Sequence, residues 1–378
     1  MMVLGEYTGG RDRPSVLVLG EGIPVPANTG KRIRTLNLLR RLSDEFEIHL
    51  LVHADEAVQE YADSLAEHGL TVHVARSSLQ KKHGLRFFLR LAASLFSPHP
   101  YSVTSHYRRE YANLLRSLLG TKRYDLIHCE WTPYARYVAD VDLPCVISAH
   151  NVESEVWRRL ALSEDNRVLG TFWRLQAWKM ERFERRVFNR CSYATTVSSR
   201  DATTIARWGC QRVVVVPNGV DLGYYNPLPA APSDSRDLVF VGSMDWRANQ
   251  DAVRWFVTEI HPRLRAMTKY QLWVIGRNPP DWMREATALP PEVRVTGEVP
   301  DVRPYLERAA VAIVPLRVGG GSRLKILEAM ACARPVVSTT IGAEGLNVVP
   351  GRDVLLADDS ADFADQLAGL LRSTVLRE

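Results

Sequence analysis

The sequence predicts an α/β protein built from two Rossmann-like domains that face each other across a cleft. At 378 residues the chain exceeds the size at which one hydrophobic core keeps growing, so two domains of about 150 to 200 residues each are expected. Continuous apolar runs alternate with helical patterns, which is typical of parallel sheets covered on both faces. Such sheets bind ligands at the carboxyl ends of their strands, so the expected site lies in the cleft.

Nine short apolar runs, rich in β-branched residues, predict strands in both halves of the chain. They are Ser15–Gly20, Ile48–Val52, Asp125–Cys129, Cys145–Ala149, Asp237–Gly242, Gln271–Gly276, Val293–Gly297, Val311–Pro315 and Pro335–Thr339. The stretch Asn226–Ser235 between the two groups is rich in Pro, Ala and Ser, as expected of an exposed linker. We therefore expect an N-terminal domain over 1–226, a linker over 227–236 and a C-terminal domain over 237–358. Residues 359–378 are expected to form a helix, for which packing back on the N-terminal domain is one option.

The composition excludes several classes of protein. A hydrophobic share of 46% with 24% charged residues is typical of a folded globular chain. The five cysteines are odd in number and lack CxxC spacing, which argues against a disulfide framework or a zinc site and favours a cytoplasmic setting. No apolar run approaches the roughly 18 to 20 residues that a membrane span requires. The net charge of +5 suits phosphate ligands, but no nucleic-acid-binding motif accompanies it, so nucleic acid is not an expected partner.

The most informative segment begins with the glycines Gly319, Gly320 and Gly321. It follows an apolar strand and precedes a predicted helix over 324–333, so the glycines and Ser322 stand at a helix N-terminus. Free backbone N–H groups and the positive end of a helix bind anions there. Arg323 and Lys325 oppose the helix dipole, which favours a role in ligand binding. The alternative is a flexible loop with a solvated basic face, but the combination of strand, glycines and cations favours a phosphate site.

Glu328 lies about one and a half turns beyond Arg323 on the same predicted helix. A carboxylate at this place can accept hydrogen bonds from the two neighbouring hydroxyls of a ribose. The alternative is an ordinary salt bridge to Lys325 or Arg323, which the spacing permits only in part. The sequence therefore favours a nucleotide whose phosphates and ribose are both bound by one helix.

The segment Leu327–Thr339, followed by Gly342–Leu346, resembles the signature of the GT4 family of retaining GT-B glycosyltransferases. Three other segments extend the resemblance over nearly the whole chain: Val216–Asp221 resembles the interdomain segment, Phe240–Met244 the opening strand of the second domain, and Gly297–Val302 the loop near the nucleotide base. The resemblance implies that the protein transfers a sugar from a nucleoside diphosphate-sugar to an acceptor hydroxyl, with retention at the anomeric carbon.

The resemblance also implies roles for residues in the second domain. Glu328 corresponds to the ribose-binding carboxylate of a motif with two glutamates, whereas Gly320 stands where the first glutamate would contact the sugar. Sugar recognition would then fall to the backbone amides of residues 319–322. The family's phosphate-binding arginine and lysine, near the first loop of the second domain, are not present in their standard form. Arg247 and Asn249 lie near those positions and Val299 lies in the loop near the base, so these three are further expected donor-binding residues. Arg247, Arg323 and Lys325 are the available substitutes for the family's phosphate-binding cations.

In the first domain, Gly30 resembles the family's glycine loop, which approaches the donor phosphates and the acceptor. Arg32 follows it and is a candidate for acceptor binding, with simple solvation as an equal alternative. His150 ends a predicted strand, at the sheet edge where catalytic groups lie, and it resembles the family's active-site histidine. Glu130 ends the preceding strand and is a second candidate for acceptor binding. We expect His150 to be the catalytic residue.

The remaining features leave the acceptor open between a sugar, a lipid-linked glycan and a small molecule. The triplet Asp140–Asp142 is interpreted as a turn, so neither a metal nor a cofactor beyond the nucleotide-sugar is expected. The basic amphipathic segment Lys81–Leu91 fits peripheral contact with a membrane or packing in the core equally well. Two alternatives to transfer remain: another GT-B reaction such as epimerisation of a nucleotide-sugar, or binding of a nucleotide-sugar without catalysis.

Overall fold

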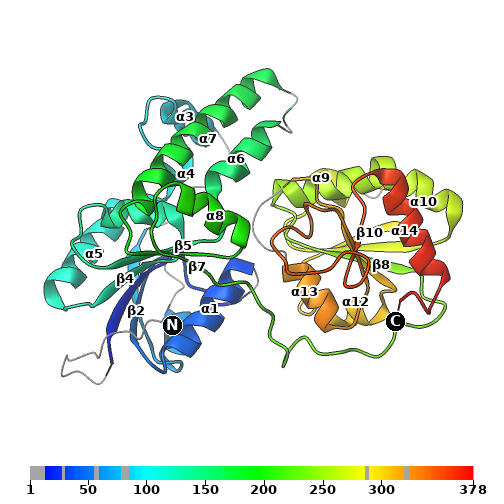
Figure 1. Ribbon diagram of the computed structural model, residues 1–378, viewed down its shortest axis with the longest axis horizontal. Helices are drawn as coiled ribbons and strands as arrows, with labels where there is room; N and C mark the ends of the chain where they lie inside the picture. The colour runs from blue at the N-terminus through cyan, green and yellow to red at the C-terminus, as the bar shows by residue number, and fades with distance from the viewer. Residues whose placement is uncertain are drawn as a thin grey trace. The chain divides into compact units, whose positions relative to one another are not determined.

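The computed structural model describes residues 13–27, 30–54, 59–77, 85–162, 164, 166–285, 289–318 and 324–377. Its contacts divide the chain into two compact units. Unit 1 comprises residues 1–158 and 167–216, and unit 2 comprises residues 159–166 and 217–378. Each unit is a parallel sheet with helices on its faces (Figure 1). The expected α/β architecture with two Rossmann-like domains is confirmed.

The sheet of unit 1 has seven parallel strands in the order β3-β2-β1-β4-β5-β6-β7. Their bounds are β1 Ser15–Leu19, β2 Glu47–Ala54, β3 Leu70–Arg76, β4 Leu126–Cys129, β5 Cys145–Ala149, β6 Tyr193–Thr196 and β7 Val213–Val215. Strand β1 shows why apolar residues occupy most positions of the central strands. Leu17 and Leu19 belong to one hydrophobic core, and Val16 and Val18 to another on the opposite face.

The helices of the first half connect these parallel strands. They are α1 Gly30–Leu42, α2 Gln59–Ala66, α3 Leu85–Ser94, α4 Tyr101–His106, α5 Arg109–Thr121, the 3-10 helix η1 Thr132–Val138, α6 Glu153–Leu162, α7 Arg167–Phe188 and α8 Ser199–Arg207. Helix α7 is the longest of these, and its buried face carries Met180, Phe183 and Phe188 into the larger core of unit 1. The core therefore lies between the sheet and the helices that follow its strands.

The sheet of unit 2 has six parallel strands in the order β10-β9-β8-β11-β12-β13. Its strands are β8 Asp237–Val241, β9 Gln271–Ile275, β10 Val293–Gly297, β11 Val311–Val314, β12 Val336–Ser338 and β13 Leu355–Leu356. Its helices are α9 Arg247–Trp255, the π-helix η2 Phe256–Ile260, α10 His261–Met267, α11 Asp281–Arg284, α12 Arg303–Arg308, α13 Leu324–Ala331 and α14 Ser360–Arg372.

The boundary between the units falls at residue 216, ten residues before the expected end of the first domain at 226. The segment after it is attached to unit 2 by backbone contacts. The N–H of Leu228 donates to the carbonyl of Cys332, and the Arg334 guanidinium donates to the carbonyl of Pro229. Helix α14 buries Phe363 and Leu367 in the core of unit 2, so the C-terminal helix packs within this unit.

All nine predicted strands are present, and four short or polar ones were missed. Strand β3 contains Thr71 and His73, β7 is largely exposed, and β6 and β13 have only four and two residues. In both sheets the strand order reverses beside the first strand, between β1 and β4 in unit 1 and between β8 and β11 in unit 2. Ligands of open α/β sheets bind at the carboxyl ends of the strands at such a point. The candidate residues should therefore follow these strands.

Candidate functional site

Glycines end the three strands β8, β9 and β10 at the carboxyl edge of unit 2. A Cβ atom on Gly276 would lie 1.8 Å from the carbonyl oxygen of Gly242, so the two loops touch through their backbones. A Cβ on Gly242 would lie 2.7 Å from Nζ of Lys325. At Gly276 only glycine avoids a clash with backbone, and at Gly242 the absence of a side chain leaves space for the ammonium group of Lys325.

Lys325 and Asn249 are brought together beside Gly242, although they are far apart in the sequence. Nζ of Lys325, on α13, donates to Oδ1 of Asn249 at 3.0 Å and lies 4.2 Å from the centre of the Phe240 ring. Asn249, on α9, donates in turn to the carbonyl of Ser243 at 2.8 Å. The amide thus orients the ammonium group and the loop after β8 together. Of the predicted donor residues, these two form a contiguous polar group.

Glu328 lies one turn after Lys325 on α13 and contacts the hydroxyl of Tyr225. Burial raises the pKa of the Glu328 carboxyl to about 7, against the opposing influence of Lys325 and of the hydrogen bond with Tyr225. A carboxyl with this pKa can accept hydrogen bonds from hydroxyl groups when it is ionised. Its position, beside the predicted phosphate-binding lysine, is the one expected for a ribose ligand.

Arg277 was missed by the sequence analysis although it lies at the same edge. It follows β9, and its Nε donates to Oγ of Ser243 at 2.8 Å, while its Nη2 lies 3.9 Å from the carboxylate of Asp245. Ser243 therefore has Arg277 on its hydroxyl and Asn249 on its carbonyl. The position of Arg277 directly after the strand-ending Gly276 was the available signal, since the carboxyl ends of parallel strands meet at one edge.

The other predicted donor residues are less closely placed or lie outside the described residues. Arg247 begins α9, and its side chain is 61% exposed. Val299 lies two residues after β10 and packs partly against the core of unit 2. Gly320, Gly321, Ser322 and Arg323 lie outside the described residues. Among the described residues, the predicted donor residues that the structure brings together are Lys325, Asn249 and Glu328, beside the glycines of the strand ends.

Glu130 is the centre of a buried polar network at the carboxyl edge of unit 1. It accepts hydrogen bonds from Oγ1 of Thr35 at 2.8 Å and from Nε2 of His128 at 2.8 Å. Burial acts to raise the pKa of the Glu130 carboxyl, but the contacts with His128 and His150 outweigh it and hold the pKa well below its ordinary value. With its side chain only 5% exposed, Glu130 is better placed to orient its neighbours than to bind an acceptor.

His150 follows β5 as predicted and is fixed by Glu130. Its Nε2 donates to the backbone carbonyl of Glu130 at 2.7 Å and lies 3.5 Å from the Oε1 atom of the same residue. Nδ1 is then the nitrogen left to act as an acceptor. Helix α6, which begins just after His150, is held by Glu184 of α7, which accepts from the N–H groups of Glu153 at 2.7 Å and Ser154 at 3.1 Å. His150 is therefore held by Glu130, and the start of the helix that follows it is held by Glu184.

Helix α1 begins at Gly30 and brings basic residues to the same edge of unit 1. Arg32 donates to the carbonyl of Pro26 at 3.4 Å. Arg34 is buried near Glu130, whose charge opposes the lowering of the Arg34 pKa by burial. Arg32 is therefore partly exposed, whereas Arg34 and Thr35 are buried.

A second polar group at this edge was not foreseen and is centred on Trp131. Nζ of Lys31 lies 4.2 Å from the centre of the Trp131 ring and 2.6 Å from the carboxylate of Glu21. The indole N–H of Trp131 donates to Glu153 at 2.8 Å, and the ring of His106 meets the indole edge to face at 4.8 Å. Although burial acts to raise the pKa of Glu21, Lys31 and His106 hold it well below its ordinary value. The group combines an aromatic face with ionised groups that can hydrogen-bond hydroxyls.

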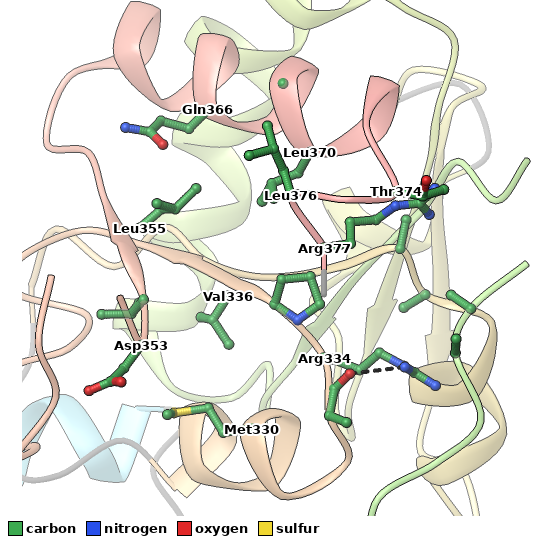
Figure 2. A pocket seen from close by; sticks show the side chains of 18 of the residues that line it. Met330, Arg334, Val336, Asp353, Leu355, Gln366, Leu370, Thr374, Leu376 and Arg377 are labelled. Atoms are coloured by element: carbon green, nitrogen blue, oxygen red, sulfur yellow. Dashed lines mark hydrogen bonds between the residues drawn. The ribbon is translucent and has the colours of Figure 1, made fainter. Parts of the chain in front are cut away.

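A hollow at the opposite edge of the unit 2 sheet is closed by α14 (Figure 2). Val336, which begins β12, lies inside it, with Met330 of α13 on one side and Leu370 of α14 on the other. The guanidinium of Arg334 is engaged there by backbone carbonyls, including that of Leu306 at 2.6 Å. Because this is the amino edge of the strands and its arginine is already occupied, we assign the hollow a packing role.

Among the residues that the structure describes, no three histidine, cysteine, aspartate or glutamate side chains converge in a way that could hold a metal ion. Within the described ranges, no helix combines the length and the apolar composition that crossing a bilayer requires.

Each unit is a parallel sheet whose strand order reverses beside its first strand. Unit 2 places Lys325 and Glu328 on one helix, and unit 1 places His150 after a strand. These are the features of a GT-B glycosyltransferase. Comparison with known families agrees with this class. A model described as Glycosyl transferases group 1 matches residues 235–373, and one described as Glycosyltransferase Family 4 matches residues 54–224. The chain belongs to the glycosyltransferase group 1 family, of the family 4 type.

Two curated relatives differ in how much of the chain they match. A Klebsiella pneumoniae protein, described as an uncharacterized 44.6 kDa protein in cps region, is 20% identical over 371 residues, which are 93% of this chain and 89% of that protein. The phosphatidyl-myo-inositol mannosyltransferase of Mycobacterium leprae is 29% identical over 173 residues, 44% of this chain and 46% of that enzyme.

Solved structures of glycosyltransferases resemble the whole chain. Anabaena HepE in complex with UDP and glucose has a TM-score of 0.65 at 15% identity, covering 97% of this chain and 92% of its own. TarM has a TM-score of 0.67 at 10% identity, covering 96% of this chain and 93% of its own. At these identities the likeness establishes the GT-B fold.

Proposed function

We propose that the protein transfers a sugar from a nucleoside diphosphate-sugar to an acceptor hydroxyl, with retention at the anomeric carbon. The observation that carries the proposal is the group formed by Lys325, Asn249 and the glycine ends of β8 and β9, with Glu328 one turn further along α13. A cation beside glycine backbone and a carboxyl beside the cation match the diphosphate and ribose of one nucleotide.

Unit 2 would supply the stabilisation of the leaving group. When the bond between the anomeric carbon and the diphosphate oxygen breaks, negative charge develops on that oxygen. The ammonium of Lys325, oriented by Asn249, offers a positive charge for it. The guanidinium of Arg277 lies at the same loop through Ser243 and offers a second one. Loss of one such donor typically costs on the order of 3 kcal/mol in the transition state, about a hundredfold in rate.

Unit 1 would supply the acceptor side. His150, with its Nε2 donating to the Glu130 carbonyl, presents Nδ1 as an acceptor for a hydroxyl proton. The group around Trp131 offers an aromatic face bordered by the carboxylates of Glu21 and Glu153. Aromatic faces and carboxylates together suit an acceptor with several hydroxyls, so we favour a sugar or glycan acceptor. The role of Arg32 in acceptor binding stays a prediction.

The comparisons guide the choice of donors and products to test. HepE and a TarM from S. aureus were each solved with UDP, and the Mycobacterium leprae relative is a mannosyltransferase, so UDP-sugars and nucleotide-linked mannose come first. The classes of product to test are a polysaccharide, a glycolipid and a glycosylated metabolite. The five free cysteines support a reducing, cytoplasmic setting.

A thermal-shift screen with nucleoside diphosphates and their sugars tests the donor site. A ligand present at about 100 times its Kd should add roughly 2.7 kcal/mol of stability. We expect Lys325→Ala to remove this stabilisation and to lower transfer by about a hundredfold, while Lys269→Ala, on an exposed lysine of unit 2, leaves both unchanged. Equal stabilisation of Lys325→Ala and the unchanged protein would overturn the donor site. Conversion of the donor without any acceptor would instead favour an epimerase.

A further inference from the structure

Helix α3 and the turn after it expose an apolar stripe. Leu89, Ala92, Ala93 and Phe96 are spaced as i, i+3, i+4 and i+7, and all four are exposed. The exposed fractions are 61% for Leu89 and 91% for Phe96. Surface helices of globular proteins normally turn such a stripe toward the core. Here the stripe faces outward, so the amphipathic pattern is reversed relative to ordinary packing.

Helix α7 holds this stripe in place through a buried lysine. Nζ of Lys179 donates to the carbonyls of Ser94 at 2.9 Å, Leu95 at 2.8 Å and Ser97 at 2.7 Å. Gln176 donates to Oγ of Ser94 at 3.2 Å. Helices α3 and α7 therefore lie side by side in unit 1 (Figure 1). Because the carbonyls of Ser94 and Leu95 before Phe96 and of Ser97 after it are hydrogen-bonded, the backbone holds Phe96 in its exposed position.

Helix α7 continues this surface with a row of long side chains. Arg174, Trp178 and Arg182 follow at intervals of four residues and are all exposed, with Trp178 at 57%. The guanidinium of Arg182 lies 6.0 Å from the centre of the Trp178 ring. Trp178 directly precedes Lys179, which bonds the end of α3, so this row lies on the helix that holds the stripe. We call the two together the α3–α7 face, defined by Leu89, Phe96, Arg174, Trp178 and Arg182.

The charge around the α3–α7 face has one sign. The sequence contains no aspartate or glutamate between Leu85 and Tyr101, nor between Arg167 and Met180. Glu181 follows, and its carboxylate is engaged by Arg158 at 2.9 Å and by Arg185 at 2.7 Å. An apolar stripe with a tryptophan and arginines at its border is the composition that interfacial helices use on anionic lipid. A protein partner would more often meet a mixed polar rim.

We propose that the α3–α7 face docks on a lipid bilayer with anionic headgroups. Leu89 and Phe96 would enter the boundary between headgroups and acyl chains, Trp178 would lie at the level of the headgroups, and Arg174 and Arg182 would meet the lipid phosphates. The sequence analysis considered Lys81–Leu91 for this role. The first four of these residues lie outside the described ranges, and the structure assigns the contact to a surface further along α3 and on α7. The proposal does not depend on the transfer reaction.

Co-sedimentation of the whole protein with two kinds of vesicle tests the proposal. One kind contains phosphatidylcholine alone, and in the other about one third is replaced by phosphatidylglycerol. We expect binding to the anionic vesicles, weakened by salt, and much less binding to the neutral ones. Phe96→Ser and Trp178→Ser should each lower the partition coefficient by about tenfold, since each removes a large apolar side chain from the interface. Arg174→Gln and Arg182→Gln should each lower it by about fivefold on anionic vesicles only.

Leu222→Ser is the matched control, because Leu222 is 68% exposed and belongs to unit 2, whereas the α3–α7 face belongs to unit 1. It should bind vesicles as the unchanged protein does. The exposed positions also predict that all five variants keep the thermal unfolding temperature of the unchanged protein. The proposal is overturned if the unchanged protein binds neither kind of vesicle. It is equally overturned if Phe96→Ser and Trp178→Ser bind as well as Leu222→Ser, or if binding ignores the lipid charge.

Discussion

The carboxyl edges of the two sheets carry different kinds of residue, although the strand order reverses beside the first strand in both sheets. In unit 2 the strands β8 and β9 end in Gly242 and Gly276, whose backbones touch and leave a lysine beside them. In unit 1 the strand β4, next to the point where the strand order reverses, is followed by Glu130, which is buried in contact with two histidines and a threonine. One edge is glycine backbone beside a lysine that Asn249 orients, and the other is a network of buried acidic, histidine and threonine side chains.

The difference indicates which unit awaits a charged ligand. A lysine ammonium beside glycine backbone gains a favourable charge interaction when an anion arrives at the strand edge. A carboxylate that is already satisfied gains nothing from a ligand, but it fixes the tautomer and direction of the histidine next to it. We therefore expect a bound ligand to stabilise unit 2 more than unit 1. Substitutions in the network around Glu130 should lower the stability of unit 1 even without ligand.

The largest effect should follow from Glu130→Ala. Removing this carboxylate leaves His128, Thr35 and the buried Arg34 without their acceptor or counter-charge. Breaking a buried ion pair from one side typically costs about 3 to 5 kcal/mol, so urea unfolding should show a loss of this size. Glu110→Gln, on an exposed glutamate of unit 1, should change the free energy of unfolding little. A loss below about 1 kcal/mol in Glu130→Ala would mean that the network is not tightly coupled.

The sequence predicted the buried strands well because burial on both faces leaves a continuous apolar run. It missed β3 and β7, where partly exposed residues interrupt the run. For the site, Lys325 and Glu328 were found because both stand on one short helix. Pairs such as Trp131 with Lys31 could not be found in this way, since residues far apart in the sequence meet only through the fold.

The cysteines illustrate the same limit. They are scattered along the sequence, and all five are free. The fold nevertheless brings Sγ of Cys129 within 4.0 Å of Cys145, on neighbouring strands, and Sγ of Cys191 within 3.8 Å of Cys210. Spacing in the sequence carries no information on such neighbours, because parallel strands place residues side by side across long connections.

A smaller effect should distinguish the touching backbones of unit 2 from an ordinary glycine. In Gly276→Ala the added Cβ would lie 1.8 Å from the carbonyl oxygen of Gly242, so the backbone must move, at a cost of about 1 to 3 kcal/mol. Gly369→Ala is the matched control, because Gly369 lies within α14 and a Cβ added there would meet nothing within 4 Å. It should stabilise the protein by about 0.5 to 1 kcal/mol. Equal effects of the two changes on chemical unfolding would contradict the close approach of the loops.

The smallest effect concerns the pH dependence of nucleotide binding in unit 2. The pKa of Glu328 is raised to about 7 in the folded protein, so the folded state binds a proton more tightly than the unfolded chain does. Between about pH 4.5 and 7 this carboxyl therefore lowers stability as the pH rises. If the ionised carboxylate accepts the ribose hydroxyls, nucleotide affinity should change in the opposite direction and increase severalfold from about pH 6 to about pH 8.

Calorimetric titration of a nucleoside diphosphate over this pH range measures the effect. Glu328→Gln keeps the size of the side chain but cannot ionise, so its affinity should be lower and nearly independent of pH, apart from titration of the nucleotide itself. A nucleoside diphosphate that lacks both ribose hydroxyls is the matched ligand, and it should show the flat profile with the unchanged protein as well. An equally steep profile for Glu328→Gln would transfer the titration to another group of unit 2 and leave Lys325 as the principal nucleotide contact on α13.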